Sequence, residues 1–592
     1  MITLTDSERV QRLLDLAARG RISRRALLEL ASVLGIGALV AGPAVVQALA
    51  AGENQNSSPL RSDYDYVIVG AGSAGCVVAR RLVDATTARI LLVEAGSSDV
   101  GIESMINPTL WTENIGSDHD YKYLYAPTPR IDGRTILLSR GKVLGGSSST
   151  NGLIWARPHR ADFDAWEAAG ADGWGYESVL PYFKRIEDWE GGASELRGAG
   201  GPMRIETAKN LHPVASALIE AGRSAGMRVL DDLNGPSGFG VGALNMNVRG
   251  GARDSSSRAY LRPVMDKPQL KVVTNARVMK LRFAGTRCVG VDLLIEGKLH
   301  NIGAKAEVVL SAGTIDTPRL LLQSGVGKAA DLKALGIEPT FDLPGVGRNL
   351  QDHVILAATA FDAAIPMEPY NNNMEGAALF WGSRAGLDAP DLAFLPIQKA
   401  FLTPELEATN PLPATAFSIA PGLLATKSRG YLRLLSKDPD GPLEIQPNML
   451  AEQADLDVLV AGFELALDLA SQPSYRAITK RWIVPAKRSS RRELIALIRK
   501  GASSYYHPVG TCAIGKGADA VVDSKLRVHG IEGLRIADAS VMPNITRVHT
   551  NATSVMIGEV AGALLASKPQ NGVASTAENS RPGFPNAPTT LL

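Results

Sequence analysis

The chain has 592 residues, a formal net charge of +2 at pH 7 and a hydrophobic fraction of 45%. This length exceeds one ordinary domain, so we expect two domains with sizeable cores, and the near-neutral charge gives no reason to expect nucleic acid. The cysteines Cys76, Cys288 and Cys512 are too widely spaced for a metal-binding pair or a disulfide framework, and the eight histidines form no close ligand pair, so we expect no metal.

The N-terminal segment has the composition of an export signal. An apolar run at 26–50 follows three arginines, residues 23–28 resemble a twin-arginine motif, and residues 48–50 offer a cleavage site of small residues. We therefore expect export to the periplasm or the cell exterior. The alternative is an uncleaved membrane anchor, because the run is long enough to span a bilayer. Residues 51–62 then form a polar linker.

An apolar run, a glycine turn, a helix-like segment and a second apolar run follow one another at 65–94. A chance glycine turn is the alternative, but the order of the segments predicts a dinucleotide-binding βαβ unit whose backbone N–H groups approach a pyrophosphate. The final Glu94 can accept ribose hydroxyls and would repel a 2′-phosphate, which makes NADP the least suitable occupant. The predicted cofactor residues of this unit are Gly70, Gly72, Ser73, Ala74, Gly75 and Glu94.

A second glycine cluster occupies 141–152 and is followed by Trp155. Its small residues, hydroxyls and amide suit a loop wrapped around a polar cofactor, although such a cluster alone would equally fit a flexible surface loop. Apolar residues on both sides and Asn151 beside Gly152 favour the cofactor loop.

Several segments together resemble the glucose-methanol-choline (GMC) oxidoreductase family. Residues 140–164 resemble its first signature, although Thr150 departs from the aliphatic residue usual there, and residues 313–327 match its second signature. Further similarities follow in the order of the family, and the resemblance extends from about 65 to 566. These further segments are 343–353, 506–511, 537–543, 549–551 and 556–559.

The resemblance implies FAD rather than NAD. The adenosine half would lie at the first glycine turn, the isoalloxazine near the second glycine cluster, and Val278 would contact the adenine side through its backbone. Some family members carry a histidine bonded covalently to the flavin where this chain has Thr150, so we expect non-covalent FAD. The further cofactor residues implied are Val143, Gly145, Ser149, Asn151, Gly152, Val278, Tyr506, Asp538, Ala539, Asn551 and Thr553.

The resemblance also implies oxidation of an alcohol by hydride transfer to the flavin, with His507 and His549 at the reacting hydroxyl. An imidazole can accept a proton at neutral pH, since its ordinary pKa is near 6.5. His507 matches the family's base, and His549 matches a position of histidine or asparagine that would orient the alcohol oxygen. Tyr505 and Tyr506 precede the base, and we consider them for an aromatic wall beside the substrate and the flavin, with core packing as the alternative. His353 is left between packing and a role at the cofactor or between domains, and the other histidines default to surface or packing positions.

The implied fold is α/β (α+β), with a discontinuous FAD-binding, Rossmann-like domain and a substrate domain built on a mixed or antiparallel sheet backed by helices. A strand at 430–434 and helices at 456–469 and 491–498 are expected in the substrate domain. The FAD domain is assigned to 63–155, 241–352 and 503–567, the substrate domain to 156–240 and 353–502, and a disordered tail to 568–592.

The substrate is less well defined by the sequence. Residues 367–381 and 396–424, which we expect to line the pocket, are apolar and methionine-containing with few charges, so an uncharged, partly apolar alcohol is favoured over choline. The electron acceptor can be oxygen, a quinone or a cytochrome. The alternatives are a cyanohydrin-type lyase, which shares the fold and the histidine pair, and a light-driven fatty acid decarboxylase of the same fold. A third alternative is a non-catalytic flavoprotein or membrane-tethered scaffold, and only against this one do the intact His507 and His549 argue.

Overall fold

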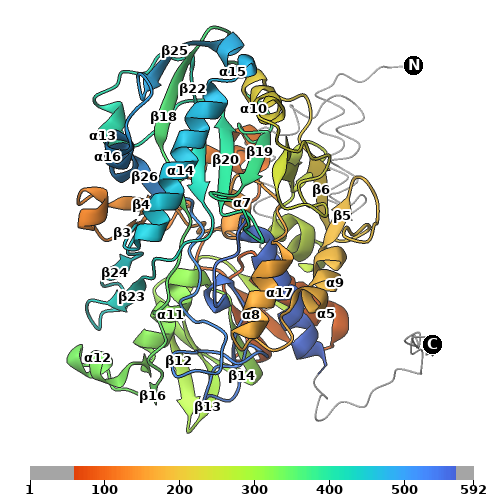
Figure 1. Ribbon diagram of the computed structural model, residues 1–592. Coiled ribbons are helices and arrows are strands. Elements are labelled where there is room, and N and C mark those ends of the chain that lie inside the picture. Colours follow the sequence, from red (N-terminus) through yellow and green to blue (C-terminus); the bar gives the residue numbers. More distant parts are fainter. Residues whose placement is uncertain (1–58, 568–592) are drawn as a thin grey trace, which may run out of the picture.

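The computed structural model describes residues 59–567 (Figure 1). The predicted signal or anchor at 1–50, most of the linker at 51–62 and the tail at 568–592 lie outside the described residues. Within 59–567, no helix combines the length and the apolar character that a membrane crossing requires.

One sheet of the described residues has seven strands in the order β11-β2-β1-β14-β13-β12, with β27 beside β14. The strands around β1 run parallel, and β12 and β13 form an antiparallel hairpin on β14. The run at 90–93 is buried throughout, as expected for a parallel strand covered on both faces. The strands are β1 (Asp63–Val69), β2 (Ile90–Val93), β11 (Leu270–Val273), β12 (Ala276–Ala284), β13 (Arg287–Ile295), β14 (Lys298–Leu310) and β27 (Leu534–Ile536).

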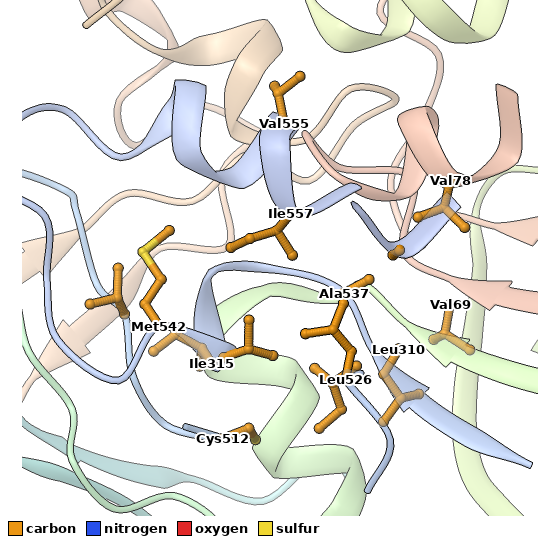
Figure 2. Packing of buried hydrophobic residues seen from close by; sticks show 14 of the residues in the cluster. Val69, Val78, Leu310, Ile315, Cys512, Leu526, Ala537, Met542, Val555 and Ile557 are labelled. Atoms are coloured by element: carbon orange, nitrogen blue, oxygen red, sulfur yellow. The ribbon is translucent and has the colours of Figure 1, made fainter. Parts of the chain in front are cut away.

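Two helices far apart in the sequence pack against each other, and the first of them covers this sheet. The helix α5 (Gly75–Ala85) follows β1, and α17 (Asn551–Ala566) lies beside it (Figure 1). A Cβ atom at Gly558 would lie 2.8 Å from the carbonyl oxygen of Ala74, so glycine is needed for the helices to approach this closely. Figure 2 shows the apolar core that these elements share with the strand ends.

A second, antiparallel sheet has nine strands within the described residues, in the order β21-β18-β22-β20-β19-β7, with β17, β25 and β26 attached. The helix α14 (Gln453–Ala470) packs on β22, and α10 (Pro213–Ser224) packs on β19 (Figure 1). The expected α/β fold with a helix-backed antiparallel sheet is therefore confirmed. The strands are β7 (Gly240–Ala243), β17 (Val354–Leu356), β18 (Ala358–Ala363), β19 (Ala377–Trp381), β20 (Leu392–Ile397), β21 (Phe401–Leu402), β22 (Ala416–Leu423), β25 (Thr479–Val484) and β26 (Ala502–Ser504).

Two of the predicted elements are found outside the two large sheets. The expected helix at 491–498 is α16 (Arg491–Gly501). The expected strand at 430–434 is β23, which pairs with β24 in a separate ribbon rather than in the large sheet. The other strands are β3 (Tyr123–Tyr125), β4 (Ile136–Leu138), β5 (Glu187–Trp189), β6 (Met203–Thr207), β8 (Asn245–Met246), β9 (Val248–Arg249), β10 (Ala252–Arg253), β15 (Val326–Gly327), β16 (Phe341–Asp342), β23 (Tyr431–Leu434) and β24 (Leu443–Gln446). The other α-helices are α6 (Glu103–Ile106), α7 (Ser147–Thr150), α8 (Arg160–Ala168), α9 (Tyr176–Ile186), α11 (Gly313–Gln323), α12 (Ala329–Ala334), α13 (Pro404–Glu407), α15 (Pro473–Ile478) and α16 (Arg491–Gly501).

The predicted division into domains stays a prediction, and the strand β7 departs from it. This strand opens the range 241–352 that was assigned to the FAD domain, yet it pairs with β19 in the second sheet. The pairing follows from tertiary contacts that the local sequence pattern does not contain.

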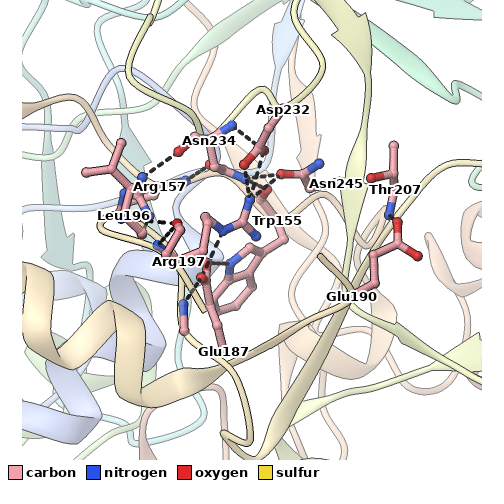
Figure 3. Close-up of polar contacts among 12 residues, drawn as sticks. Trp155, Arg157, Glu187, Glu190, Leu196, Arg197, Thr207, Asp232, Asn234 and Asn245 are labelled. Atoms are coloured by element: carbon pink, nitrogen blue, oxygen red, sulfur yellow. Dashed lines mark hydrogen bonds and ion pairs between the residues drawn. The ribbon is translucent and has the colours of Figure 1, made fainter. Parts of the chain in front are cut away.

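A buried polar cluster holds the chain after the second glycine cluster (Figure 3). The Trp155 indole Nε1 donates to Glu187 Oε1 at 2.9 Å, and Arg197 Nε donates to Glu187 Oε2 at 2.9 Å. The Asn234 amide donates to the Trp155 carbonyl at 2.9 Å. These bonds pair the buried charges of Arg197 and Glu187 and fix the chain where it leaves the glycine loop.

Candidate active site

A cavity of about 1040 Å³ is lined by residues of both sheets. Most of the predicted site residues lie on its wall. They are Gly70, Gly72, Ser73, Ala74, Glu94, Asn151, Gly152, Val278, Tyr506, His507, Asp538, Ala539, His549 and Asn551. The predicted residues Gly75, Val143, Gly145, Ser149 and Thr553 are not part of the wall. Of these, Ser149 Oγ donates to the Leu144 carbonyl at 2.8 Å, which stabilises the loop from behind.

The two glycine clusters touch each other at the end of β1. Gly70 has a φ of +98°, and a Cβ atom at Gly75 would lie 2.0 Å from the Gly70 carbonyl oxygen. The N–H of Gly145 donates to the Ala71 carbonyl at 2.7 Å. A Cβ atom at Gly72, in contrast, would approach only the Ser311 carbonyl oxygen, at 3.8 Å. The turn is therefore tightly packed behind and open toward the cavity at Gly72.

Glu94 braces this turn in addition to lining the cavity. Its carboxyl group accepts the N–H of Ala71 at 3.0 Å and the N–H of Gly96 at 2.8 Å. Burial raises the pKa of Glu94 to about 7, against the effect of these backbone donors. The sequence predicted only the role of Glu94 toward a ribose.

Asp538 and Asn551 lie on the same wall and connect it to neighbouring elements. One oxygen of Asp538 accepts from Gly313 N at 2.9 Å and Thr317 Oγ1 at 2.6 Å, which ties the start of α11 to the loop after β27. Ser73 Oγ donates to Asn551 Oδ1 at 3.1 Å. Asn551 Nδ2 is buried without a hydrogen-bond partner among the described residues, so it remains available to a ligand in the cavity.

Three histidines meet at the end of the cavity. The ring centroids of His507 and His549 are 5.0 Å apart, and the Nδ1 atoms of His353 and His507 are 3.0 Å apart. The Tyr505 ring stacks on the His507 ring, with centroids 4.9 Å apart. Burial is the main cause that lowers the pKa of His507 well below its usual range and the pKa of His353 and of His549 to about 3. All three rings are therefore neutral at pH 7.

The ring nitrogens of these histidines differ in their partners. His507 lies on the cavity wall and its Nδ1 contacts His353, so Nε2 is the nitrogen left for the cavity. Both ring nitrogens of His549 are buried without a hydrogen-bond partner among the described residues. Two neighbouring, neutral, hydrogen-bonding rings can together hold one hydroxyl group and take up its proton.

The rest of the cavity near the histidines is mainly apolar. Two ionisable side chains, Glu375 and Lys399, also lie on this wall. Glu375 accepts a hydrogen bond from Asn373 Nδ2 at 2.9 Å, and burial raises its pKa to about 8. Lys399 Nζ donates to Thr112 Oγ1 at 3.2 Å, and burial lowers its pKa. The apolar wall residues are Trp111, Ile355, Met374, Leu395, Ile397 and Phe401.

Family models described as GMC oxidoreductase match residues 64–355 and 426–558. The chain belongs to the GMC oxidoreductase family. It is 35% identical over 542 residues to the mitochondrial choline dehydrogenase of Homo sapiens, covering 86% of this chain and 91% of the relative. It is 35% identical over 526 residues to the oxygen-dependent choline dehydrogenase of Brucella anthropi, covering 84% and 94%. The solved structure of pyridoxine 4-oxidase from Mesorbium loti has a TM-score of 0.81 at 30% identity, covering 84% of this chain and 98% of that one.

The predicted family and enzyme class are therefore confirmed. This GMC oxidoreductase is an FAD-dependent oxidoreductase that acts on CH–OH donors. The residues present fit FAD, because the wall combines a glycine turn open at Gly72 with the unpartnered amide of Asn551. Among residues 59–567, no cluster of three or more histidine, cysteine, aspartate or glutamate side chains could hold a metal ion.

One residue of this GMC site gave no signal in the sequence. Arg253 is buried, and its Nη1 donates to Asn151 Oδ1 at 2.7 Å and to the Ser148 carbonyl at 3.3 Å. Burial lowers the pKa of Arg253 to about 9. Because Oδ1 of Asn151 is occupied by Arg253 and Leu153 N, the amide nitrogen of Asn151 is the group left for the cavity.

Proposed function

We propose that this protein oxidises an uncharged, partly apolar alcohol to an aldehyde or ketone, with His507 as the general base and His549 as the orienting residue. The observation that carries the proposal is the pair of rings on one cavity wall. His507 has Nε2 free for the cavity, and His549 has no partner at either nitrogen among the described residues. The same histidine pair would also fit a cyanohydrin-type lyase, so this alternative and a light-driven fatty acid decarboxylase are separated from the proposed function by the titration with alcohols.

The two histidines would divide the work on the hydroxyl group. A neutral His507 takes the hydroxyl proton on Nε2, and an N–H of His549 donates to the alcohol oxygen and holds it in place. When bound, FAD accepts the carbon-bound hydrogen together with its electron pair. His549 is buried and His507 is half-buried, and hydrogen bonds in such surroundings are stronger than in bulk water.

We propose further that FAD is held without a covalent bond. Thr150 lies on the cavity wall where some family members carry the bonded histidine, and a hydroxyl offers no nucleophilic nitrogen. The composition of residues 1–50 supports export by a twin-arginine route or a membrane tether. The electron acceptor is oxygen, a quinone or a cytochrome, and the residues of the site favour none of the three.

The test of the function is an anaerobic titration of the purified holoenzyme with aliphatic, aromatic, polyol and amino alcohols. We expect the visible flavin band to bleach with at least one uncharged class, because the base and the orienting group are both in place. Admitting air to the bleached enzyme then separates an oxidase from a dehydrogenase. A flavin that stays oxidised with every alcohol would overturn the proposal and make cyanohydrins and illuminated fatty acids the next substrates.

Choline is the second candidate substrate, because two relatives are named choline dehydrogenases. Comparing choline with its uncharged isostere 3,3-dimethylbutan-1-ol tests how Glu375 and Lys399 affect the preference for a cationic or a neutral alcohol. Below its pKa of about 8, Glu375 is neutral and offers no negative charge to a cation, so at pH 7 we expect the isostere to reduce the flavin at a lower concentration than choline. Above that pKa Glu375 is ionised and attracts the cation. At pH 9 the ratio of the half-saturating concentration of choline to that of the isostere should therefore be about tenfold smaller than at pH 7.

The matched variant for this comparison is Glu375→Gln, which keeps the shape of the side chain and removes its titration. In this variant the ratio of the two half-saturating concentrations should change less between pH 7 and pH 9 than in the wild type, and any change that remains belongs to Lys399. A wild-type enzyme that prefers choline at pH 7 would contradict the uncharged substrate class without touching the proposed oxidation.

A further inference from the structure

We propose that His353 is a positioning residue that holds the proton of the His507 ring on Nδ1, and so leaves the lone pair of Nε2 free to act as the base. The inference rests on the proposed function for its catalytic meaning. Its structural part, the position of one proton, can be measured without turnover.

The contact between the two rings is short and well fixed. The Nδ1 atoms are 3.0 Å apart, and the rings stand at 88° with centroids 5.2 Å apart. His353 is fully buried, and the Tyr505 ring packs edge-on against it at 6.2 Å. The buried ring of His353, which packs against two neighbouring rings, has little freedom to rotate away, so the Nδ1 contact persists.

Main-chain pairing keeps the segments of the two histidines in register. Gln351 and Val509 exchange both backbone hydrogen bonds, at 3.0 and 2.9 Å, and Tyr505 N donates to the His353 carbonyl at 3.1 Å. On the far side of His353, β17 pairs with β26. His353 and His507 therefore lie inside a small antiparallel ladder, which holds their Cα positions before any side-chain contact forms.

Asp352 completes the support from the neighbouring position. Its Oδ1 accepts the backbone N–H of His507 at 2.8 Å, and its Oδ2 accepts the Tyr125 hydroxyl at 2.8 Å. Tyr506, just before His507, has a φ of +62°, an unfavourable conformation for a residue with a side chain. The dipeptide Asp352-His353 thus fixes both the main chain and the ring of His507.

The short Nδ1 contact determines where the protons lie. Both rings are neutral at pH 7, so one Nδ1 must carry a proton and the other must accept it. If His353 donated, the proton of His507 would sit on Nε2 and would block the base. If His507 donates, Nε2 keeps its lone pair and His353 carries its own proton on Nε2.

The proposed role of His507 as the base selects the second arrangement, because only that arrangement leaves a lone pair on Nε2 of His507. It places the proton of His353 on Nε2, which is buried and has no hydrogen-bond partner among the described residues. The geometry fixes one proton between the two Nδ1 atoms, and a measurement of the ring protons decides which ring carries it.

The kinetic test compares His353→Asn with His353→Leu. An asparagine oxygen can accept the Nδ1 proton of His507 in place of the imidazole, whereas leucine cannot. We expect His353→Leu to lower the limiting rate of flavin reduction by about ten- to hundredfold, and His353→Asn to recover most of it. Without an acceptor the charged form of His507 is destabilised, so the acid limb of the rate profile should shift to lower pH in His353→Leu only.

His212→Leu is the control for replacing a buried histidine by leucine. His212 is buried, lies outside the cavity wall and contacts the Met367 carbonyl at 3.0 Å. This control should keep the wild-type rate and pH profile, with bound FAD and the melting temperature recorded for every variant. Equal losses in His353→Asn and His353→Leu without a shifted acid limb would overturn the inference.

A spectroscopic measurement decides the position of the proton directly. In the ¹⁵N spectrum of histidine-labelled holoenzyme, His507 should show a protonated Nδ1 and an unprotonated Nε2, with the eight histidines assigned by single substitutions. A protonated Nε2 on His507 would overturn the inference even if alcohols bleach the flavin. If no alcohol bleaches the wild-type flavin, the proposed function fails, and this spectrum still decides whether His353 sets the proton.

Discussion

His507→Ala is expected to lower the rate of flavin reduction by alcohol by about 10²- to 10⁴-fold while FAD stays bound. This range is what a positioned general base contributes. The ring is the group on the wall whose Nε2 is free to take the hydroxyl proton, whereas His549 is assigned to hold the alcohol oxygen. The measurement is the limiting rate in anaerobic stopped flow at saturating alcohol.

FAD should remain bound because the cofactor cradle does not depend on the His507 ring. The turn at Gly70 is held by Glu94 and by the Gly145 N–H, and the support from Asp352 acts on the backbone N–H of residue 507, which alanine retains. His300→Ala on β14, a residue that is not part of the cavity wall, is the matched control and should change nothing. Loss of FAD together with activity would make His507 structural, and a near-normal rate would place the base elsewhere.

The sequence predicted the parts of the site that short motifs contain. Gly70, Gly72 and Gly75 fall within six residues, and their strand, turn and helix form one local unit, so their backbone roles follow from the spacing alone. The histidines His507 and His549 came from the family resemblance instead. Their common cavity is a result of the fold that no local pattern contains.

Residues that act through long-range contacts could not be predicted. Arg253 and Asn151 are 102 positions apart, and His353 and His507 are 154 positions apart. Such pairs form only when strands meet in register, and the local pattern around Arg253 resembles an ordinary polar turn. The same reason explains β7, whose partner β19 lies more than a hundred residues along the chain. Glu375 had no sequence signal either, because an isolated acid in an apolar strand region is normally read as solvent-facing.

Gly75→Ala and Gly72→Ala should separate folding from cofactor binding. At position 75 the new Cβ atom would lie 2.0 Å from the Gly70 carbonyl oxygen and 3.2 Å from Ser311 Cβ. The first contact is with main chain that Ser311 and Val93 hold in the sheet, so it cannot be relieved by a rotamer change. We expect a loss of about 3 kcal/mol or more in the free energy of unfolding, and protein that carries little FAD.

At position 72 the same methyl group has room in the protein, since its nearest neighbour, the Ser311 carbonyl oxygen, is 3.8 Å away. It would instead project at the cavity, where the βαβ unit brings its backbone closest to a pyrophosphate. Gly72→Ala apoprotein should therefore unfold at the wild-type temperature but bind FAD more weakly, by at least tenfold in a flavin titration. Equal melting temperatures for the two apoprotein variants would contradict the close contact behind Gly75, and wild-type FAD affinity in Gly72→Ala would move the pyrophosphate away from this turn.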